Sequence, residues 1–403
     1  MRDFHLARAL ASRCELTFLE LCHPGDNAGV EPPASAGFAE VISVSKGRGY
    51  TPAKVLQGLL GRVPLTVLNC HSSQVSAKLA RVLREGLFDT VHLVGVQLSE
   101  YLPVVRAAPS RPVVVMDWHN IESELMWRYA ERALLPKRLV ARRTARQLET
   151  TENRLLAACE AHTVVSMRDR TALLARCSVA DIHSVPNGVD VSYFSAAKPW
   201  RGCQLGQQGG GERRSVVFVG SMDYHANIDA VLWFSKNVWA ELAERRPDLD
   251  FVIVGRSPSA EILALRSDRV RVTGTVDDVR PFYESALAAI VPLRVGSGTR
   301  LKVLEAMAAG VPVVSTRLGV EGIALEPEVH FLAADSAREM LEAIHRLADS
   351  PETGHRLSAV AREFVIRHHD WTAIGAHLFE IHQDLHSRRA SQIRGTPPGR
   401  SIL

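Results

Sequence analysis

The stretch Val291–Thr316, VPLRVGSGTRLKVLEAMAAGVPVVST, decides the fold of this chain. Its start completes the apolar run Leu287–Leu293, which is short and sharply bounded, as a buried strand is. The Gly296–Gly298 segment allows a tight turn and a close approach of the backbone to a ligand. Strong helix formers follow, Gly310 and Pro312 end the helix, and a second apolar run reads as another buried strand. The stretch therefore predicts one strand–loop–helix–strand unit.

Groups suited to phosphate gather at the start of the predicted helix. The main-chain amides of Gly298, Thr299 and Arg300 would lie at its N-terminus, where the helix dipole favours an anion. Arg300 and Lys302 place two cations in the first turn, which disfavours the helix but suits a bound anion. The alternative is a core helix with a surface pair of Lys302 and Glu305, three residues apart. Glycine loops match by chance often enough that the spacing alone leaves both interpretations open.

The same stretch resembles the donor-binding signature of retaining GT-B glycosyltransferases, glycosyltransferase family 4 (group 1 type) in particular. In that family the glutamate of an EA(M/L)A(A/C)G segment, here Glu305, hydrogen-bonds the ribose of a nucleotide sugar. The loop before it, here Gly296, Ser297, Gly298 and Thr299, holds the diphosphate. Many members carry a second glutamate eight residues before the first, where this chain has Ser297. The GSGTRLK form is similar to one branch of the family, whose members often serve bacterial exopolysaccharide or lipopolysaccharide assembly.

Length and composition fit such an enzyme. The chain has 403 residues, enough for two or three domains, and its 46% hydrophobic and 23% charged residues are ordinary for a globular protein. A net charge of +4 suits anionic ligands or an acidic membrane surface and falls short of what nucleic-acid binders show. The 6 cysteines have no metal-like spacing, which favours reduced thiols. No apolar run approaches the length of a membrane span and the sequence contains no signal-peptide pattern, so we expect a cytoplasmic protein.

The N-terminal half predicts strands alternating with helices such as Val75–Glu85, and hence a parallel sheet covered on both faces. The family pattern implies a strand and a glycine-rich loop before the first helix, Met1–Ala11, and this sequence has neither. Because that strand is central in a doubly wound sheet, we expect either a start upstream or a weakened first domain. The strands expected from short apolar runs are Leu16–Leu21, Val41–Val44, Leu65–Leu68, Val91–Val94 and Val113–Met116.

Polar residues follow the Val113–Met116 strand. Carboxyl ends of strands are where open α/β sheets bind ligands, and Asp117 with His119 could orient an acceptor hydroxyl or a sugar. The alternative is a polar turn in which Asp117 or Asn120 caps the next helix. The resemblance to a histidine-containing loop at this place in the family makes His119 and Asp117 the candidate catalytic pair.

The segment Arg132–Arg146 is rich in arginine and lysine within a helical stretch. Family members that use lipid-linked acceptors often touch the membrane through basic amphipathic helices, so one interpretation is peripheral contact with the inner membrane face. The other, which we favour, is a solvated face whose charges pair with Glu131 and Glu149.

The domain boundary has its own signature. Val185–Asp190 with Phe194 resembles the VPNGVD…F segment at the boundary between the two domains of the family. We therefore expect a Rossmann-like acceptor-side domain over residues 1–195, a linker over 196–214 and a donor domain over 215–370. A helix over 371–386 is expected to cross back to the first domain, with a disordered tail over 387–403.

The donor domain contributes three further predictions. Gly220 and Ser221 end its first strand and would let the backbone approach the diphosphate. Many relatives carry a lysine or arginine soon after, where this chain has none, so Arg300 and Lys302 are expected to supply that charge. Gly274, at the end of a later strand, precedes a segment that resembles the place where the family holds the base with main-chain atoms. We assign no metal ligand, because the histidines near position 369 lie at a helix end, where histidine is ordinarily favourable.

Together these features imply a GT-B protein with two Rossmann-like domains facing a cleft. The resemblance implies a retaining hexosyltransferase that moves a sugar from a nucleotide diphosphate sugar to the hydroxyl of a sugar or lipid-linked acceptor, in cell-surface polysaccharide or glycolipid synthesis. It implies no metal and no cofactor besides the nucleotide sugar, and no nucleic-acid partner. Two alternatives stay open, a nucleotide-sugar epimerase of the same fold and a nucleotide-sugar-binding protein without catalysis.

Overall fold

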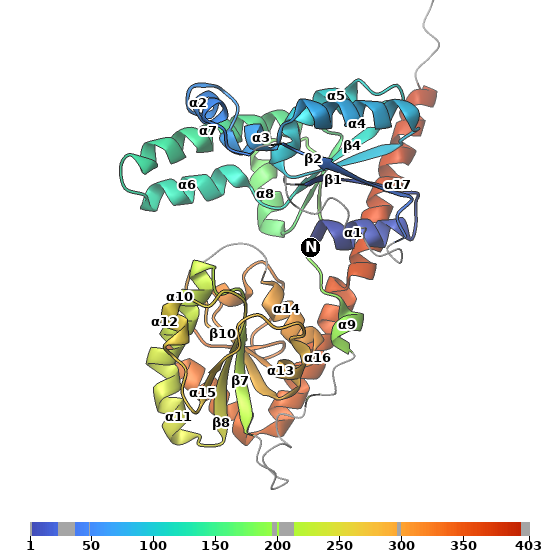
Figure 1. Cartoon of the computed structure of the whole chain (residues 1–403). Coiled ribbons are helices and arrows are strands. Elements are labelled where there is room, and N and C mark those ends of the chain that lie inside the picture. The colour runs from blue at the N-terminus through green and yellow to red at the C-terminus, as the bar shows by residue number, and fades with distance from the viewer. Residues whose placement is uncertain are drawn as a thin grey trace, which may run out of the picture. The chain divides into compact units, whose positions relative to one another are not determined.

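The computed structural model describes residues 2–22, 37–47, 49–195, 200, 213–295 and 300–395. They form two compact units, Met1–Pro186 together with Ile374–Leu403, and Asn187–Ala373. In both units all pairs of named strands are parallel, and helices pack around the sheets (Figure 1). This confirms the prediction of an α/β protein with two Rossmann-like domains. Within the described residues, no helix combines the length and apolar character that a membrane span requires.

The second unit contains one sheet of six strands in the order β12-β11-β10-β7-β8-β9. The strands are β7 (Arg214–Val219), β8 (Leu249–Val254), β9 (Val270–Val272), β10 (Ala286–Val291), β11 (Val313–Ser315) and β12 (Leu332–Ala333). The helices are α9 (Val191–Ser195), α10 (His225–Phe234), α11 (Ala240–Arg245), α12 (Ala260–Leu263), α13 (Arg280–Glu284), α14 (Leu301–Ala308), α15 (Ala337–Asp349) and α16 (Pro351–His369). Two short helical turns are η3 (Ser235–Trp239), which joins α10 to α11, and η4 (Leu318–Val320).

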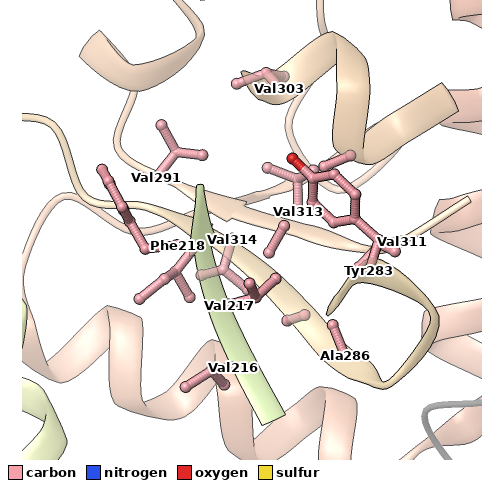
Figure 2. Packing of buried hydrophobic residues seen from close by; sticks show 14 of the residues in the cluster. Val216, Val217, Phe218, Tyr283, Ala286, Val291, Val303, Val311, Val313 and Val314 are labelled. Carbon is pink, nitrogen blue, oxygen red and sulfur yellow. The ribbon is translucent and has the colours of Figure 1, made fainter. Parts of the chain in front are cut away.

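The core of the second unit explains why its strands read as continuous apolar runs. Both faces of β10 are covered, so all six of its residues are buried. Figure 2 shows valines of β7, β10 and β11 packed with Phe218, Tyr283 and Val303 of α14. Each fully buried side chain of this size contributes roughly 1.5–3 kcal/mol. The predicted strand–loop–helix–strand unit is present as β10, α14 and β11.

The chain order fixes where this sheet can bind a ligand. From β7 the chain proceeds to β8 and β9 on one side, and the later strands β10, β11 and β12 lie on the other side. The order therefore reverses between β7 and β10. Open α/β sheets bind ligands at such a reversal, beyond the carboxyl ends of the strands. The residues that follow β7 and β10 are the ones the sequence assigned to the donor.

The first unit contains two sheets, β1-β2 and β3-β4-β5-β6. The strands are β1 (Thr17–Cys22), β2 (Glu40–Ser45), β3 (Thr90–Val94), β4 (Val113–Trp118), β5 (Ala161–Val164) and β6 (Ile182–Ser184). Among the described residues β1 pairs only with β2, and β3 only with β4. The expectation of a strand before Met1 stays a prediction.

Ten helical segments accompany these strands in the described part of the first unit. They are α1 (Arg2–Ala11), α2 (Pro52–Leu60), α3 (Leu65–Cys70), α4 (Ser73–Glu85), η2 (Val96–Tyr101), α5 (Leu102–Arg106), α6 (Glu122–Arg132), α7 (Lys137–Ala158), α8 (Met167–Arg176) and α17 (Trp371–Gly395). Most of α17 belongs to this unit, where Thr90 is hydrogen-bonded to His386. The chain thus returns to its first unit through a terminal helix.

One predicted strand is wrong. Leu65–Leu68 lies in the helix α3, which starts after Pro64. The hydroxyl group of Tyr101 donates to the carbonyl of Cys70 and so holds the end of this helix. A short apolar run fits a buried helix as well as a buried strand, and tertiary contacts decided between them.

The boundaries also differ from those expected. The division lies between Pro186 and Asn187 rather than after residue 195, because Phe194 of α9 packs against Tyr283 in the second unit, with ring centroids 6.2 Å apart. Within the expected linker, Trp200 is buried and donates to the carbonyl of Ala286. The rest of the linker, apart from 213–214, lies outside the described residues.

The terminal helix is longer than the sequence suggested. α17 continues to Gly395, so residues 387–395 of the expected disordered tail are helical. Residues 396–403 lie outside the described part of the chain. The arginines and serines after His386 are compatible with a helix, and Arg388 continues it with an ion pair to Asp181 in the same unit.

Candidate functional site

The loop that follows β7 is shaped by close packing of backbone. A Cβ atom on Gly220 would lie 2.8 Å from Nδ2 of Asn227 and 3.0 Å from Nζ of Lys302. A Cβ atom on Gly255, at the end of the neighbouring β8, would overlap the Gly220 carbonyl. Asn227 in the first turn of α10 donates to the carbonyl of Ser221 and so fixes the loop. Close packing within the protein therefore requires glycine at position 220, and its predicted approach to a diphosphate stays a prediction.

Lys302 is the cation that lies against this loop. Its ammonium group donates to Oδ1 of Asn227 and lies 4.3 Å from the centroid of the Phe218 ring. Burial, and next the charge of Arg300, lower the pKa of Lys302 to about 7, while Glu305 acts in the opposite direction. No ion pair within 4 Å joins Lys302 to a described carboxylate. The group has donors to spare and is placed where an added anion would restore its full charge.

Glu305 lies one turn further along α14, on the same face as Lys302. Burial raises the pKa of its carboxyl group, partly offset by the charge of Lys302. No described residue donates a hydrogen bond to this carboxylate. Burial also raises the pKa of Tyr283, with a further contribution from Glu305, and the tyrosine hydroxyl has no hydrogen-bond partner among the described residues. The surface-pair alternative for Lys302 and Glu305 does not describe two half-buried groups of this kind.

Arg300 precedes α14 and is 4% exposed. Its guanidinium donates from Nε to the carbonyl of Leu318 in η4 and lies 3.9 Å from Glu321. Burial lowers the pKa of Arg300, and Glu321 partly offsets this. The two cations predicted to act together thus have different partners, Lys302 at the β7 loop and Arg300 at η4.

Of the other predicted donor residues, the structure describes only some. Gly296, Ser297, Gly298 and Thr299 lie outside the described residues. Gly274 follows β9 with a φ of +76°, which favours glycine, and an added Cβ would meet no atom within 4 Å. It lies at the same carboxyl edge of the sheet as Gly220 because all six strands are parallel.

The sequence analysis missed two residues of this site. Arg256 follows β8 and donates from Nε to the Ser221 hydroxyl at 2.8 Å, and that hydroxyl donates to Asp223. The loop after β7 contains no lysine or arginine. Arg256 supplies a positive charge to this loop from the end of the neighbouring strand β8. Asn227 is the other. The signal for Arg256 was its place at the carboxyl end of a strand beside β7.

In the first unit, Asp117 ends the buried strand β4 and is 1% exposed. Its carboxylate accepts from Arg2 at 3.1 and 3.3 Å and from the Thr163 hydroxyl at 2.7 Å. Burial alone would raise the pKa of Asp117, but the charges of Arg2 and His92 and these hydrogen bonds hold it below its usual value. The predicted helix cap is not formed, because Ile121 occupies the cap position of α6. Asp117 is an anchored carboxylate.

His119 is the more accessible member of the predicted pair. Its Nε2 atom lies 2.7 Å from Asp3 and 3.7 Å from Asp117. The hydrogen bond with Asp3 raises the pKa of His119, although burial opposes it. Ligand atoms of these three residues lie within 4.8 Å of one another, as in a metal site. The Arg2 guanidinium already neutralises Asp117, so the cluster is better described as an ion-pair network.

Sequence comparisons with known proteins match part of the chain. Residues 213–350 match the family model described as "Glycosyl transferases group 1". An uncharacterized glycosyltransferase of Haemophilus influenzae is 29% identical over 160 residues, 38% of this chain and 44% of that protein. A phosphatidyl-myo-inositol mannosyltransferase of Mycobacterium leprae is 26% identical over 212 residues, 51% of this chain and 54% of that protein. The chain thus spans about half the length of the curated relatives it matches.

Solved structures resemble nearly the whole chain. Sucrose-phosphate synthase from Thermosynechococcus elongatus has a TM-score of 0.66 at 19% identity, covering 95% of this chain and 92% of that one. HepE of Anabaena, solved in complex with UDP, has a TM-score of 0.62 at 15% identity and covers 95% of each chain. At such identities the likeness shows the fold, which is GT-B. By sequence over its second unit and by fold over most of its length, the protein is similar to glycosyltransferases.

Proposed function

We propose that the protein is a retaining hexosyltransferase that moves a sugar from a nucleotide diphosphate sugar to an acceptor hydroxyl. The observation that carries the proposal is the group of Lys302, Glu305 and Asn227 at the reversal between β7 and β10. A half-buried lysine of lowered pKa and a half-buried carboxylate of raised pKa are both poised for a ligand rather than for each other. They lie within residues 213–350, the region that matches the family model described as "Glycosyl transferases group 1".

The donor would bind with its diphosphate at the Gly220 loop. Lys302 contributes positive charge from α14. Arg256 contributes positive charge from its position beside Ser221, to whose hydroxyl it is hydrogen-bonded. Glu305 accepts hydrogen bonds from the ribose hydroxyls. As the bond to the sugar breaks, negative charge accumulates on the diphosphate, and a fixed cation stabilises that charge more than it stabilises the bound donor.

The same arrangement supports metal independence, which we propose together with the reaction. Lys302 and Arg256 supply positive charge of the kind that a divalent cation supplies elsewhere. A phosphate oxygen of the departing diphosphate takes the proton of the acceptor hydroxyl. On the first unit, His119 with Asp3 and Asp117 behind it provides an imidazole that can orient a sugar hydroxyl.

For the acceptor we propose a sugar or lipid-linked glycan of the cell surface. The support for the acceptor is the similarity in sequence to a phosphatidyl-myo-inositol mannosyltransferase. For the donor, the solved structure of HepE, which shares the fold, contains UDP. UDP-sugars are the first donors to test, followed by GDP- and ADP-sugars.

The experiment combines binding with product analysis. Thermal shift with each nucleotide sugar identifies the donor, and chromatography with NMR identifies the product and its anomeric configuration. Transfer with retention, unchanged by EDTA, supports the proposal. Transfer with inversion would contradict the proposed retaining mechanism. An epimerised donor would indicate an epimerase, and tight binding without turnover would indicate a binding protein. Lys302→Met should abolish turnover, while Lys236→Met, an exposed lysine of the same unit, should leave it unchanged.

A further inference from the structure

The guanidinium group of Arg2, in the first turn of α1, is held by a carboxylate and two main-chain carbonyls. Its Nε and Nη2 atoms donate to the two carboxylate oxygens of Asp117, at 3.3 and 3.1 Å. Nη2 and Nη1 also donate to the carbonyls of Val185 and Pro186, each at 2.9 Å. The Arg2 side chain is 8% exposed. Arginine suits this set of acceptors better than lysine, because its N–H donors form a flat, rigid fork.

The two carbonyls are fixed acceptors. Val185 follows β6, is fully buried and donates from its own amide to the carbonyl of Val164 in β5, at 2.8 Å. Pro186 is the last residue of the first unit before the chain passes to the second, and its ring restricts the backbone at that point. Arg2 is therefore anchored on backbone rather than on mobile side chains, and through Arg2 the Asp117 carboxylate is anchored there too.

His119 lies beside two carboxylates but is within hydrogen-bonding distance of only one. Its Nε2 atom is 2.7 Å from Asp3, the residue after Arg2, and 3.7 Å from Asp117, which is too long for a hydrogen bond. When Nε2 carries the proton that is shared with Asp3, Nδ1 of the neutral ring is an acceptor. Among the described residues no hydrogen bond occupies Nδ1, and 35% of the side chain is exposed. The ring can thus receive a hydrogen from a ligand.

The charge of Arg2 acts on the His119 ring as well. The hydrogen bond with Asp3 raises the pKa of His119 and burial lowers it; of the more distant charges, Asp117 raises this pKa and Arg2 lowers it. Loss of Arg2 would therefore remove the charge that opposes Asp117, and the pKa of His119 would rise. The titratable and charged groups that act on the ring come from four elements: Arg2 and Asp3 of α1, His92 of β3, Asp117 of β4 and Glu122 of α6.

We propose that Arg2 is a positioning residue for the acceptor side of the reaction. It keeps the Asp117 carboxylate from bonding His119, so that Asp3 alone takes the Nε2 proton and Nδ1 accepts the hydrogen of the acceptor hydroxyl. Without Arg2 the carboxylate would hold the ring as imidazolium, in which both nitrogens are donors and neither can accept. This inference rests on the proposed function, in which His119 orients a sugar hydroxyl.

The test follows the ring C–H resonances of His119 by NMR in the protein without substrate, with His119→Gln to identify them. In Arg2→Gln the midpoint of this titration should move to higher pH. The same variant should lower kcat by about 100-fold, the scale of a misplaced reacting group. Donor affinity, measured by calorimetry, should stay that of the wild type, because the proposed donor residues belong to the second unit. Arg2→Lys keeps the charge without the fork, so kcat should fall although the midpoint moves little.

Arg8→Gln is the matched control, since Arg8 is an exposed arginine on the same helix, and it should change none of the three measurements. If Arg2→Gln does not fold, the comparison is made within Asp117→Asn, which removes the buried carboxylate that Arg2 neutralises. Adding Arg2→Gln to that variant should still raise the midpoint. An unchanged midpoint, or a donor affinity that falls as far as kcat, would overturn the proposal. A wild-type protein that transfers no sugar would instead contradict the proposed function, and the midpoint, measured without substrate, would still test the action of Arg2 on His119.

Discussion

Donor binding should weaken as the pH rises from 6 to 8, and Lys302 is the reason. Its ammonium group is half-buried, with Asn227 as its hydrogen-bond acceptor and the charge of Arg300 nearby, so its pKa falls to about 7. In the proposed donor site, a diphosphate at the Gly220 loop would bind the charged form. The protein must therefore take up a proton on binding whenever Lys302 starts neutral.

The size of the effect follows from this pKa. A group with a pKa near 7 is about 90% charged at pH 6 and about 10% charged at pH 8. If only the charged form binds, affinity falls by about tenfold over this range, or about 1.4 kcal/mol. Below pH 6 it should change little, because Lys302 is then already protonated.

Titration calorimetry with an intact nucleotide sugar measures this cleanly. Its diphosphate is esterified at both ends and has no group that titrates near neutrality, unlike a free nucleoside diphosphate. Repeating each titration in buffers of different ionisation enthalpy gives the number of protons taken up. Lys302→Arg is the matched control, because arginine stays charged over the whole range and its affinity should not depend on pH. Because the variant retains Glu305, any pH dependence that Glu305 causes remains in the control and can be subtracted.

A wild-type affinity that is flat from pH 6 to 8, with no proton uptake, would contradict this reasoning. So would a Lys302→Arg variant with the same pH dependence as the wild type. The first result would mean that Lys302 is charged before the donor arrives, and the second that another group takes up the proton.

Three further predictions concern single contacts. Glu305→Gln should weaken donor binding by about 1–3 kcal/mol, the range for a hydrogen bond to a charged group. A 2′,3′-dideoxy nucleotide should bind the wild type and the variant equally. If the variant keeps the wild-type affinity for the donor, Glu305 does not bind the ribose. Arg256→Gln should lower affinity for the nucleoside diphosphate by about 0.5–1 kcal/mol, a small value because the side chain is exposed, and leave the nucleoside unaffected; equal losses for both ligands would argue against a phosphate contact. Burial lowers the pKa of His92 and that of His382, the latter to about 3, so the His382 ring stays neutral at pH 5 in the folded protein. Because the unfolded chain binds a proton on His382 near pH 6.5, stability of the first unit should fall as the pH drops from 6.5 to 5, by up to about 1 kcal/mol per pH unit from this histidine. Hydrogen exchange in β3 measures this, and His382→Phe should reduce the slope.

The sequence by itself determined the elements and their order. Val291–Thr316 is an apolar run, a glycine loop, a helix-forming segment and a second apolar run, and each of these is a local property that the chain carries wherever it folds. The same holds for the buried strands β7, β8 and β10. Leu65–Leu68 shows the limit of this reasoning, since four apolar residues fit a helix or a strand and contacts with η2 select the helix.

Tertiary structure decided the state of each charged group. Lys302 meets Asn227, 75 residues earlier, and Asp117 meets Arg2, 115 residues earlier. Neither partner belongs to a motif, and burial together with these partners sets the pKa values on which the chemistry depends. The sequence placed a lysine and a glutamate on one face of a helix. Only the packing of α14 against β7 made one a titrating cation and the other a carboxylate without a protein donor, because desolvation depends on what surrounds a side chain and not on its neighbours in the chain.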